Sequence, residues 1–217
     1  MPHKRIVRYV ILLCLLAALG EFMARGPLRT LQSGNFTDFS GTYVAARRWL
    51  SGADPYDSSQ FKATWEVAGG AHFSGNRGSE ANVRPAYPPS SLPVLAPFAF
   101  FRWTVARDLF LVSAIALFPF LLWSVLKLEG VPWNSDNGLL TCAFALALAP
   151  WHAAIALQSI SAQAIELAVI GVSLRSTIGG GLLTGLALCL KPNWQCGSWC
   201  LKSRTNAGAG YSRLAGY

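Results

Sequence analysis

Apolar residues in this chain gather into long stretches, and these stretches predict helices that cross a membrane. A helix needs about 20 apolar residues to span a hydrocarbon core of about 30 Å. The stretches at 6–23 and 105–128 have or approach that length, and 138–157 does so with a bend expected at its proline. Two shorter stretches follow at 162–174 and 178–190. The pattern predicts an all-α polytopic membrane protein with about five hydrophobic segments.

The first apolar stretch has two interpretations. A basic flank, His3 to Arg8, precedes an apolar run that ends near Ala17-Ala18-Leu19-Gly20, as in a secretory signal peptide with its cleavage site. An uncleaved helix with its N-terminus in the cytoplasm fits the same residues. The later apolar stretches favour the uncleaved helix.

Residues 24–104 form a long polar loop after the first stretch. Its first part, 37–50, predicts a short amphipathic helix lying on the membrane surface, because a threonine can cap it and apolar residues recur along it. The Gly-, Ser- and Ala-rich run at 58–83 predicts a mobile segment, and the three prolines that follow exclude a regular helix. The apolar run 91–101 is too short to span and predicts a re-entrant or interfacial element, or the first turns of a broken helix.

Basic residues predict the orientation, because lysine and arginine are in excess in cytoplasmic loops. With the N-terminus in the cytoplasm, the short inner ends carry the basic N-terminal flank, Lys127 and Arg175, and the long loop lies outside. A carboxylate just outside the membrane, at the start of a polar loop, can exchange protons at the bilayer surface. Four polar residues then share the outer face: Asp38, Tyr87, Gln163 and Lys191.

Composition agrees with membrane insertion and gives no sign of nucleic-acid binding or of a metal site. The chain is 53% hydrophobic and 13% charged, whereas soluble domains have about 25% charged residues. The net charge of +8 is explained by topology, and no soluble basic module with stacking aromatics is visible, so we expect no nucleic-acid partner. The histidines are isolated, and the Cys196–Cys200 pair lacks a second ligand pair, so we expect no metal site.

The end of the chain breaks the pattern, because hydrophobic periodicity is lost after Asn193. We therefore expect a membrane unit at 1–193 and an atypical tail at 194–217, produced by truncation or a change of reading frame. Further apolar helices encoded in another frame immediately downstream would support this interpretation, and their absence would contradict it.

Several segments, taken in order, resemble a known family. They are Asp38-Phe39 leading to Tyr43-Val44-Ala45-Ala46-Arg47, then Gly52-Ala53-Asp54-Pro55-Tyr56-Asp57, then Tyr87-Pro88-Pro89, and finally Gly185 to Pro192. The set, from about Asp38 to Asn193, resembles the first part of the GT-C glycosyltransferases of family 87. The family's Gly-Gln pair is matched here only in part, by Ala162-Gln163. The family's members are longer and have further helices, which puts activity of this chain in question.

The resemblance implies a polytopic hexosyltransferase similar to the mannosyltransferases, with a polyprenyl-phosphate sugar as donor and a lipid or glycan as acceptor. The implied location is a bacterial plasma membrane with the active face extracytoplasmic. Inverting transfer needs a base for the acceptor hydroxyl, and the resemblance gives that role to Asp38. The departing phosphate needs cationic stabilisation. Candidate substrate-binding residues are Arg47, Arg84, Tyr87, Gln163 and Lys191. No cofactor beyond the donor is implied, and the need for a metal stays open.

Structural interpretations of the same residues remain open. Asp38 could cap its own helix, Asp54 and Asp57 could form a turn, and Lys191 could lie at the interface merely as an anchor. Two other functions also remain. A transporter or lipid carrier would use intramembrane polar residues as a path, although transporters usually keep their loops short. An inactive remnant of a transferase would insert and do nothing.

Overall fold

The computed structural model describes residues 2–32, 37–70 and 87–191, and these ranges contain helices and no strand. The predicted all-α membrane fold is confirmed. Arg84, the tail 194–217 and the Cys196–Cys200 pair lie outside the described residues.

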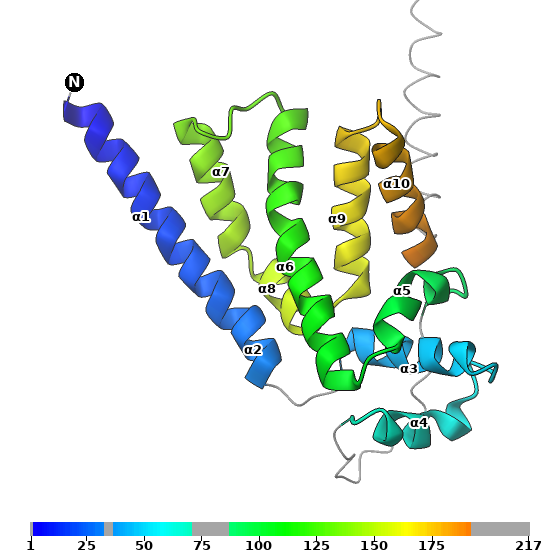
Figure 1. The fold of residues 1–217 in the computed structure, drawn as a ribbon. Helices are drawn as coiled ribbons and strands as arrows, with labels where there is room; N and C mark the ends of the chain where they lie inside the picture. Colours follow the sequence, from blue (N-terminus) through cyan, green and yellow to red (C-terminus); the bar gives the residue numbers. More distant parts are fainter. Residues whose placement is uncertain (1, 33–36, 71–86, 192–217) are drawn as a thin grey trace, which may run out of the picture.

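The five predicted hydrophobic segments are all helical (Figure 1). In the described part of the chain, two helices are long and apolar enough to cross a membrane: α1 (Pro2–Arg25), continued by α2 (Pro27–Gln32), and α6 (Trp103–Leu128). Helices α7 (Asp136–Ala147) and α8 (Ala149–Ala156) form a third candidate span, bent by 52°. Helices α9 (Ile160–Ser173) and α10 (Ile178–Leu190) are apolar but shorter.

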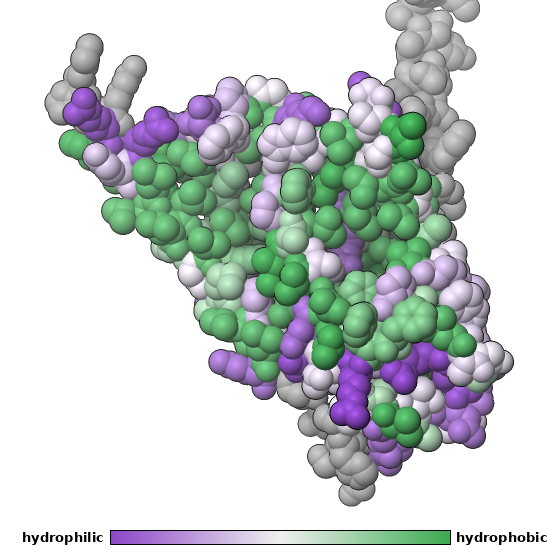
Figure 2. Space-filling model, viewed as in Figure 1, coloured by the Kyte–Doolittle hydropathy of each residue, from purple (hydrophilic) through white to green (hydrophobic). Residues whose placement is uncertain are grey.

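Hydropathy along the surface matches an integral membrane protein. Figure 2 shows an apolar band over the long helices with hydrophilic side chains at both ends. The start of α1 and the C-terminal ends of α6 and α9 lie at one end, and α3, α5 and the C-terminal end of α10 lie at the other (Figure 1). This alternation agrees with the helix order inferred from the sequence. Which end faces the cytoplasm stays a prediction.

The bend between α7 and α8 falls at Leu148, two residues before Pro150. Proline has no N–H, so the carbonyl of Leu146 loses its usual helical donor four residues on. His152 Nε2 lies 2.6 Å from this carbonyl oxygen, which assigns the ring proton to Nε2. The other ring nitrogen, Nδ1, is buried and has no hydrogen-bond partner in the described ranges. The His152 imidazole thus replaces the hydrogen bond that the Leu146 carbonyl loses at the bend, and this role explains why His152 is buried.

The loop after the first span contains four short helical elements within its described residues. They are α3 (Asp38–Leu50), the 3₁₀ turn η1 (Ser58–Gln60), α4 (Phe61–Val67) and α5 (Ser91–Ala99). The predicted helix at 37–50 and the short element at 91–101 are confirmed. The mobile segment predicted at 58–83 begins instead with helical elements as far as Val67, because Phe61 and Trp65 are buried and anchor α4 to the core. Residues 71–83 of this prediction lie outside the described residues.

Helix α3 is buried on nearly all sides, so the prediction of a helix lying on the membrane surface is wrong. Only its end behaves as a surface, with Trp49 43% and Leu50 40% exposed. The physical reason is its small side chains: Ser40, Gly41 and the Ala45–Ala46 pair leave room for neighbouring elements around the helix. Neighbouring elements therefore cover the side chains that a surface helix would expose.

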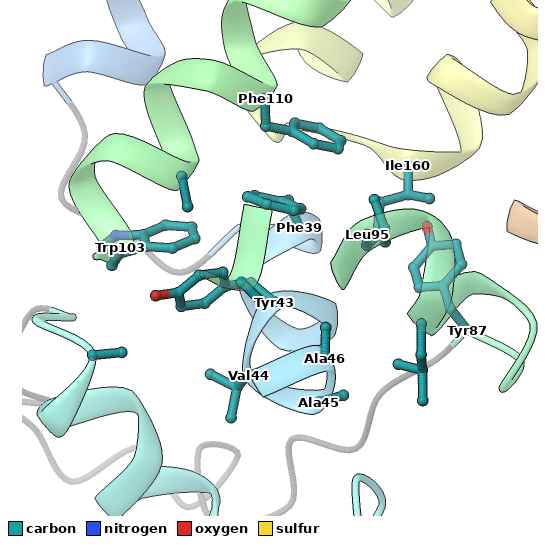
Figure 3. Close-up of a cluster of buried hydrophobic side chains, with 14 of the residues drawn as sticks. Phe39, Tyr43, Val44, Ala45, Ala46, Tyr87, Leu95, Trp103, Phe110 and Ile160 are labelled. Carbon is teal, nitrogen blue, oxygen red and sulfur yellow. The ribbon is translucent and has the colours of Figure 1, made fainter. Parts of the chain in front are cut away.

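Stacked aromatic rings hold α3 against the start of α6 (Figure 3). The Phe39 and Phe110 rings stack with centroids 4.0 Å apart. The ring centroid of Trp103 lies 5.3 Å from that of Tyr43 and 4.7 Å from that of Trp65, which brings α4 into the same cluster. Such pairs add about 0.5–1.5 kcal/mol each beyond burial. Phe39 is therefore a rigid anchor for the residue before it, Asp38.

Glycines bring α9 and α10 into close contact. A Cβ on Gly171 would lie 2.4 Å from Thr184 Oγ1, and a Cβ on Gly180 would lie 2.1 Å from the carbonyl oxygen of Leu174. Small residues allow this approach between membrane helices, where there is no hydrophobic drive to bring them together. The contact fixes the position of the chain at the far end of α10, where Lys191 follows.

We predict that Gly171→Ala lowers the free energy of unfolding by about 1–3 kcal/mol, because the added methyl forces the two helices apart. Gly185→Ala in α10 is the matched control, since a Cβ there meets nothing within 4 Å and both substitutions gain the same helix propensity. Thermal unfolding of both variants in detergent, followed by tryptophan fluorescence, measures the difference. Equal midpoints would contradict the close packing.

We also predict that His152→Leu destabilises the protein more in the native background than in a Pro150→Ala background. An alanine at this position supplies a backbone N–H to the Leu146 carbonyl, so the imidazole is no longer needed there. The decrease in the free energy of unfolding caused by His152→Leu should differ between the two backgrounds by about 1 kcal/mol or more. A double-mutant cycle of unfolding midpoints measures the coupling, and identical decreases would exclude this role of His152.

Candidate active site

The carboxylate of Asp38 is docked onto the N-terminus of α9. The Asp38 N–H donates to the Leu157 carbonyl oxygen at 3.0 Å, and the Ile160 N–H donates to Asp38 Oδ2 at 3.2 Å. Ile160 is the first residue of α9, whose free N–H groups and dipole favour a negative charge. Among the described residues, Asp38 therefore caps a helix distant in sequence, and its Oδ1 has no donor there.

Tyr87 and Lys191 join Asp38 through a serine on α9. The Tyr87 hydroxyl donates to Asp38 Oδ2 at 2.5 Å and lies 3.2 Å from Ser161 Oγ. Lys191 Nζ donates to the same Ser161 Oγ at 2.7 Å. Figure 3 shows the Tyr87 hydroxyl pointing toward Ile160 at the start of α9. The structure thus brings together three of the residues selected from the sequence, Asp38, Tyr87 and Lys191.

The electrostatic setting keeps Tyr87 a hydrogen-bond donor. Burial first, and then the hydrogen bond to Asp38, raise the pKa of the Tyr87 hydroxyl well above its ordinary value of 10.0. The hydroxyl therefore keeps its proton at physiological pH. It acts as a fixed donor to the carboxylate rather than as a second base.

The turn at 52–57 supports Tyr87 from behind. The Tyr56 hydroxyl donates to the Tyr87 carbonyl oxygen at 3.1 Å.

Hydrogen bonds within the turn hold its own shape. Arg48 is buried and donates to the Asp54 carbonyl oxygen at 2.8 Å and to Asp57 Oδ2 at 3.4 Å. Asp54 Oδ1 accepts from the Tyr56 N–H at 2.9 Å. Hydrogen bonds from Ser59 lower the pKa of the Asp57 carboxyl. Both aspartates lie in the turn they were predicted to form.

Gln158 holds the connection between α8 and α9 in place. Its φ of 50° lies in the left-handed region, where a side chain is strained unless its surroundings compensate. The compensation is visible: its Oε1 accepts from the Thr37 hydroxyl at 3.0 Å, and its Nε2 donates to the Arg107 carbonyl oxygen at 2.8 Å. The connection that receives Asp38 is thereby tied to both α3 and α6.

Two predicted substrate-binding residues lie elsewhere. Arg47 follows Asp38 by nine positions, which places it on the opposite face of α3, and its Nη1 donates to the Ala99 and Phe101 carbonyl oxygens. Gln163 is buried between α9 and α6, where its Nε2 donates to Ser113 Oγ at 2.9 Å. One turn further along α9, Glu166 is fully buried and neither of its oxygens has a hydrogen-bond partner in the described part of the chain.

Sequence reasoning missed Ser161, Gln158 and the Ile160 N–H. The connection they belong to was expected on the outer face, but no spacing marks a serine there as part of a site. A backbone donor has no side-chain signature at all. In the described ranges, no group of three or more His, Cys, Asp or Glu side chains could hold a metal ion.

The described structure thus places a half-buried carboxylate close to a tyrosine, a serine and a lysine at one end of the helix bundle. The model of glycosyltransferase family 87 matches residues 86–193, about half of the chain. The chain belongs to this family and is a membrane glycosyltransferase by class. The matched range contains Tyr87, Ser161 and Lys191, and Asp38 precedes it. Neither the curated proteins nor the solved structures contain a match.

We predict that Gln158→Ala lowers the free energy of unfolding by about 2 kcal/mol, because the buried Thr37 hydroxyl and the Arg107 carbonyl oxygen both lose a hydrogen bond. The control is Gln32→Ala at the exposed end of α2, which should change the midpoint little. Thermal unfolding in detergent measures both. A decrease in the midpoint no larger for Gln158→Ala than for Gln32→Ala would contradict a stabilising role of the Gln158 hydrogen bonds.

Proposed function

We propose that this protein transfers a hexosyl group, mannose by family default, from a polyprenyl-phosphate donor to a lipid or glycan acceptor. The proposed face is extracytoplasmic and the proposed membrane is a bacterial plasma membrane. The observation that carries the proposal is the cluster of Asp38, Tyr87, Ser161 and Lys191 in a chain of a glycosyltransferase family. A site at the ends of membrane helices suits a donor whose sugar is attached to a lipid.

The geometry of Asp38 supports its role as the base. Oδ2 is engaged by Tyr87 and by the Ile160 N–H, which holds the side chain in one orientation. Oδ1 has no donor among the described residues, and the side chain is half-buried rather than sealed. A positioned carboxylate with one free oxygen can accept a proton from an acceptor hydroxyl.

Lys191 supports the departing phosphate in this proposal. An ammonium group has three N–H donors, and one of them is used on Ser161. The other two are available for phosphate oxygens, because Lys191 is half-buried and has no other partner in the described ranges. Arg47 and Gln163 are not part of the proposed donor site, because Arg47 lies on the opposite face of α3, where its Nη1 donates to the Ala99 carbonyl oxygen, and Gln163 Nε2 donates to Ser113. Arg84 stays a prediction.

The proposed step is a single displacement with inversion. The acceptor oxygen forms a bond to the anomeric carbon while the bond from that carbon to the phosphate oxygen breaks. The electron pair leaves with the polyprenyl phosphate, whose charge Lys191 offsets, and the hydroxyl proton passes to Asp38 Oδ1. The base acts on the face opposite the leaving group, as in inverting glycosidases. The need for a metal in this step is open.

We predict that Asp38→Asn lowers the rate of transfer by about 10²–10⁴-fold, because the isosteric amide keeps the shape of the site but takes no proton. The assay follows label from polyprenyl-phosphate mannose into membrane lipids and glycans, with the protein in native membranes. Binding of the donor should survive in Asp38→Asn and weaken in Lys191→Met. The control is Asp136→Asn at the other end of the bundle, which should transfer like the native protein.

Transfer by Asp38→Asn at the native rate would exclude Asp38 as the base. Movement of the labelled lipid across the membrane without transfer, unchanged in Asp38→Asn, would instead indicate a lipid carrier. Correct insertion of each variant is checked by its yield in the membrane fraction.

A further inference from the structure

The hydroxyl of Ser161 stands between the two charged groups of the site. Ser161 Oγ lies 2.7 Å from Lys191 Nζ and 3.2 Å from the Tyr87 hydroxyl oxygen. Tyr87 in turn contacts Asp38 Oδ2. Three successive hydrogen bonds therefore run from the ammonium group at the end of α10 to the carboxylate at the start of α3. Their middle lies in the first turn of α9.

The chemistry of the two ends leaves one arrangement of protons along this chain. An ammonium group only donates, and an ionised carboxylate only accepts. The single proton of Tyr87 is used on Asp38, so the Tyr87 oxygen accepts. The single proton of Ser161 then points to Tyr87, and the Ser161 oxygen accepts from Lys191. Every donor is oriented from the cation toward the carboxylate, and no hydroxyl is left to choose between partners.

We propose that Ser161 is a positioning residue that couples the phosphate-binding cation Lys191 to the base Asp38 through Tyr87. The inference rests on the proposed function and assigns a role to a residue for which the sequence offered none. Hydrogen bonds to charged groups are the stronger ones, and bonds in a chain polarise one another. A glycosyl phosphate that engages Lys191 is thereby brought into register with the carboxylate that takes the acceptor's proton.

Helix α9 is suited to this role because it holds the carboxylate by two routes. The Ile160 N–H contacts Asp38 Oδ2 directly, and the next residue, Ser161, reaches the same oxygen through Tyr87. Without the serine hydroxyl, Lys191 loses its acceptor in the described site and Tyr87 loses its donor. Asp38 keeps its backbone contact, so the fold is retained while the cation and the base become independent.

The first test compares Ser161→Ala with Ser161→Thr, using transfer from polyprenyl-phosphate mannose by the full chain in membranes. Ser161→Ala should lower kcat by about tenfold or more, with a smaller change in the KM for the donor, because binding partners remain but their register is lost. Ser161→Thr keeps the hydroxyl and should restore most of the rate. Ser159→Ala is the control, since its side chain makes no capping bond at the start of α9.

Native kcat in Ser161→Ala, or no recovery in Ser161→Thr despite normal insertion, would overturn the proposal. Ser159→Ala should transfer at the native rate, because its side chain makes no capping bond at the start of α9. A fall in kcat as large in Ser159→Ala as in Ser161→Ala would also overturn the proposal.

The second test needs no catalysis. Thermal midpoints are measured for Ser161→Ala in the native, Tyr87→Phe and Lys191→Met backgrounds. If the chain exists, the loss of midpoint caused by Ser161→Ala is smaller in both altered backgrounds, because one of its bonds is already gone. Strictly additive losses would overturn the inference even if transfer is observed. Coupled losses without any transfer would retain the chain of hydrogen bonds and reject the proposed function.

Discussion

The candidate site depends on one tertiary contact, the docking of Asp38 onto the first residues of α9. Two backbone groups are involved: the Leu157 carbonyl accepts from the Asp38 N–H, and the Ile160 N–H donates to the carboxylate. The contact satisfies a helix N-terminus that would otherwise have unpaired donors. It also fixes where α3 meets the membrane helices. Tyr87 and Lys191 are then arranged around a carboxylate that is already immobile.

This docking is rigid because the residue after Asp38 is buried among aromatic rings. Phe39 is fully buried and stacks on Phe110 of a spanning helix, while Tyr43 and Trp103 close the cluster. A loop helix is thus built into the membrane unit as firmly as the spans themselves. The arrangement serves a surface site well, because a carboxylate half open to solvent needs a support that solvent does not reach.

The sequence predicted the spans well, since length and apolar composition alone decide them. Of the four polar residues predicted to share one end, Asp38, Tyr87 and Lys191 lie together, because alternating helices place them there without any detail of packing. Gln163 is instead buried between α9 and α6. The prediction of an amphipathic surface helix failed for α3, because Gly41, Ala45 and Ala46 allow neighbouring elements to contact the helix on nearly all sides. Sequence reasoning also failed for Ser161 and the Ile160 N–H, whose roles exist only once distant segments have met.

The two ends of the site are positioned by different kinds of interaction. Asp38 is held by a helix N-terminus and an aromatic core at the membrane surface. Lys191 is held from within the membrane, because the glycine contact between α9 and α10 sets where α10 ends. Ser161 belongs to α9, which takes part in both. A substitution in the α9–α10 contact therefore displaces the cation Lys191 relative to the base Asp38, even though the contact is distant from the site.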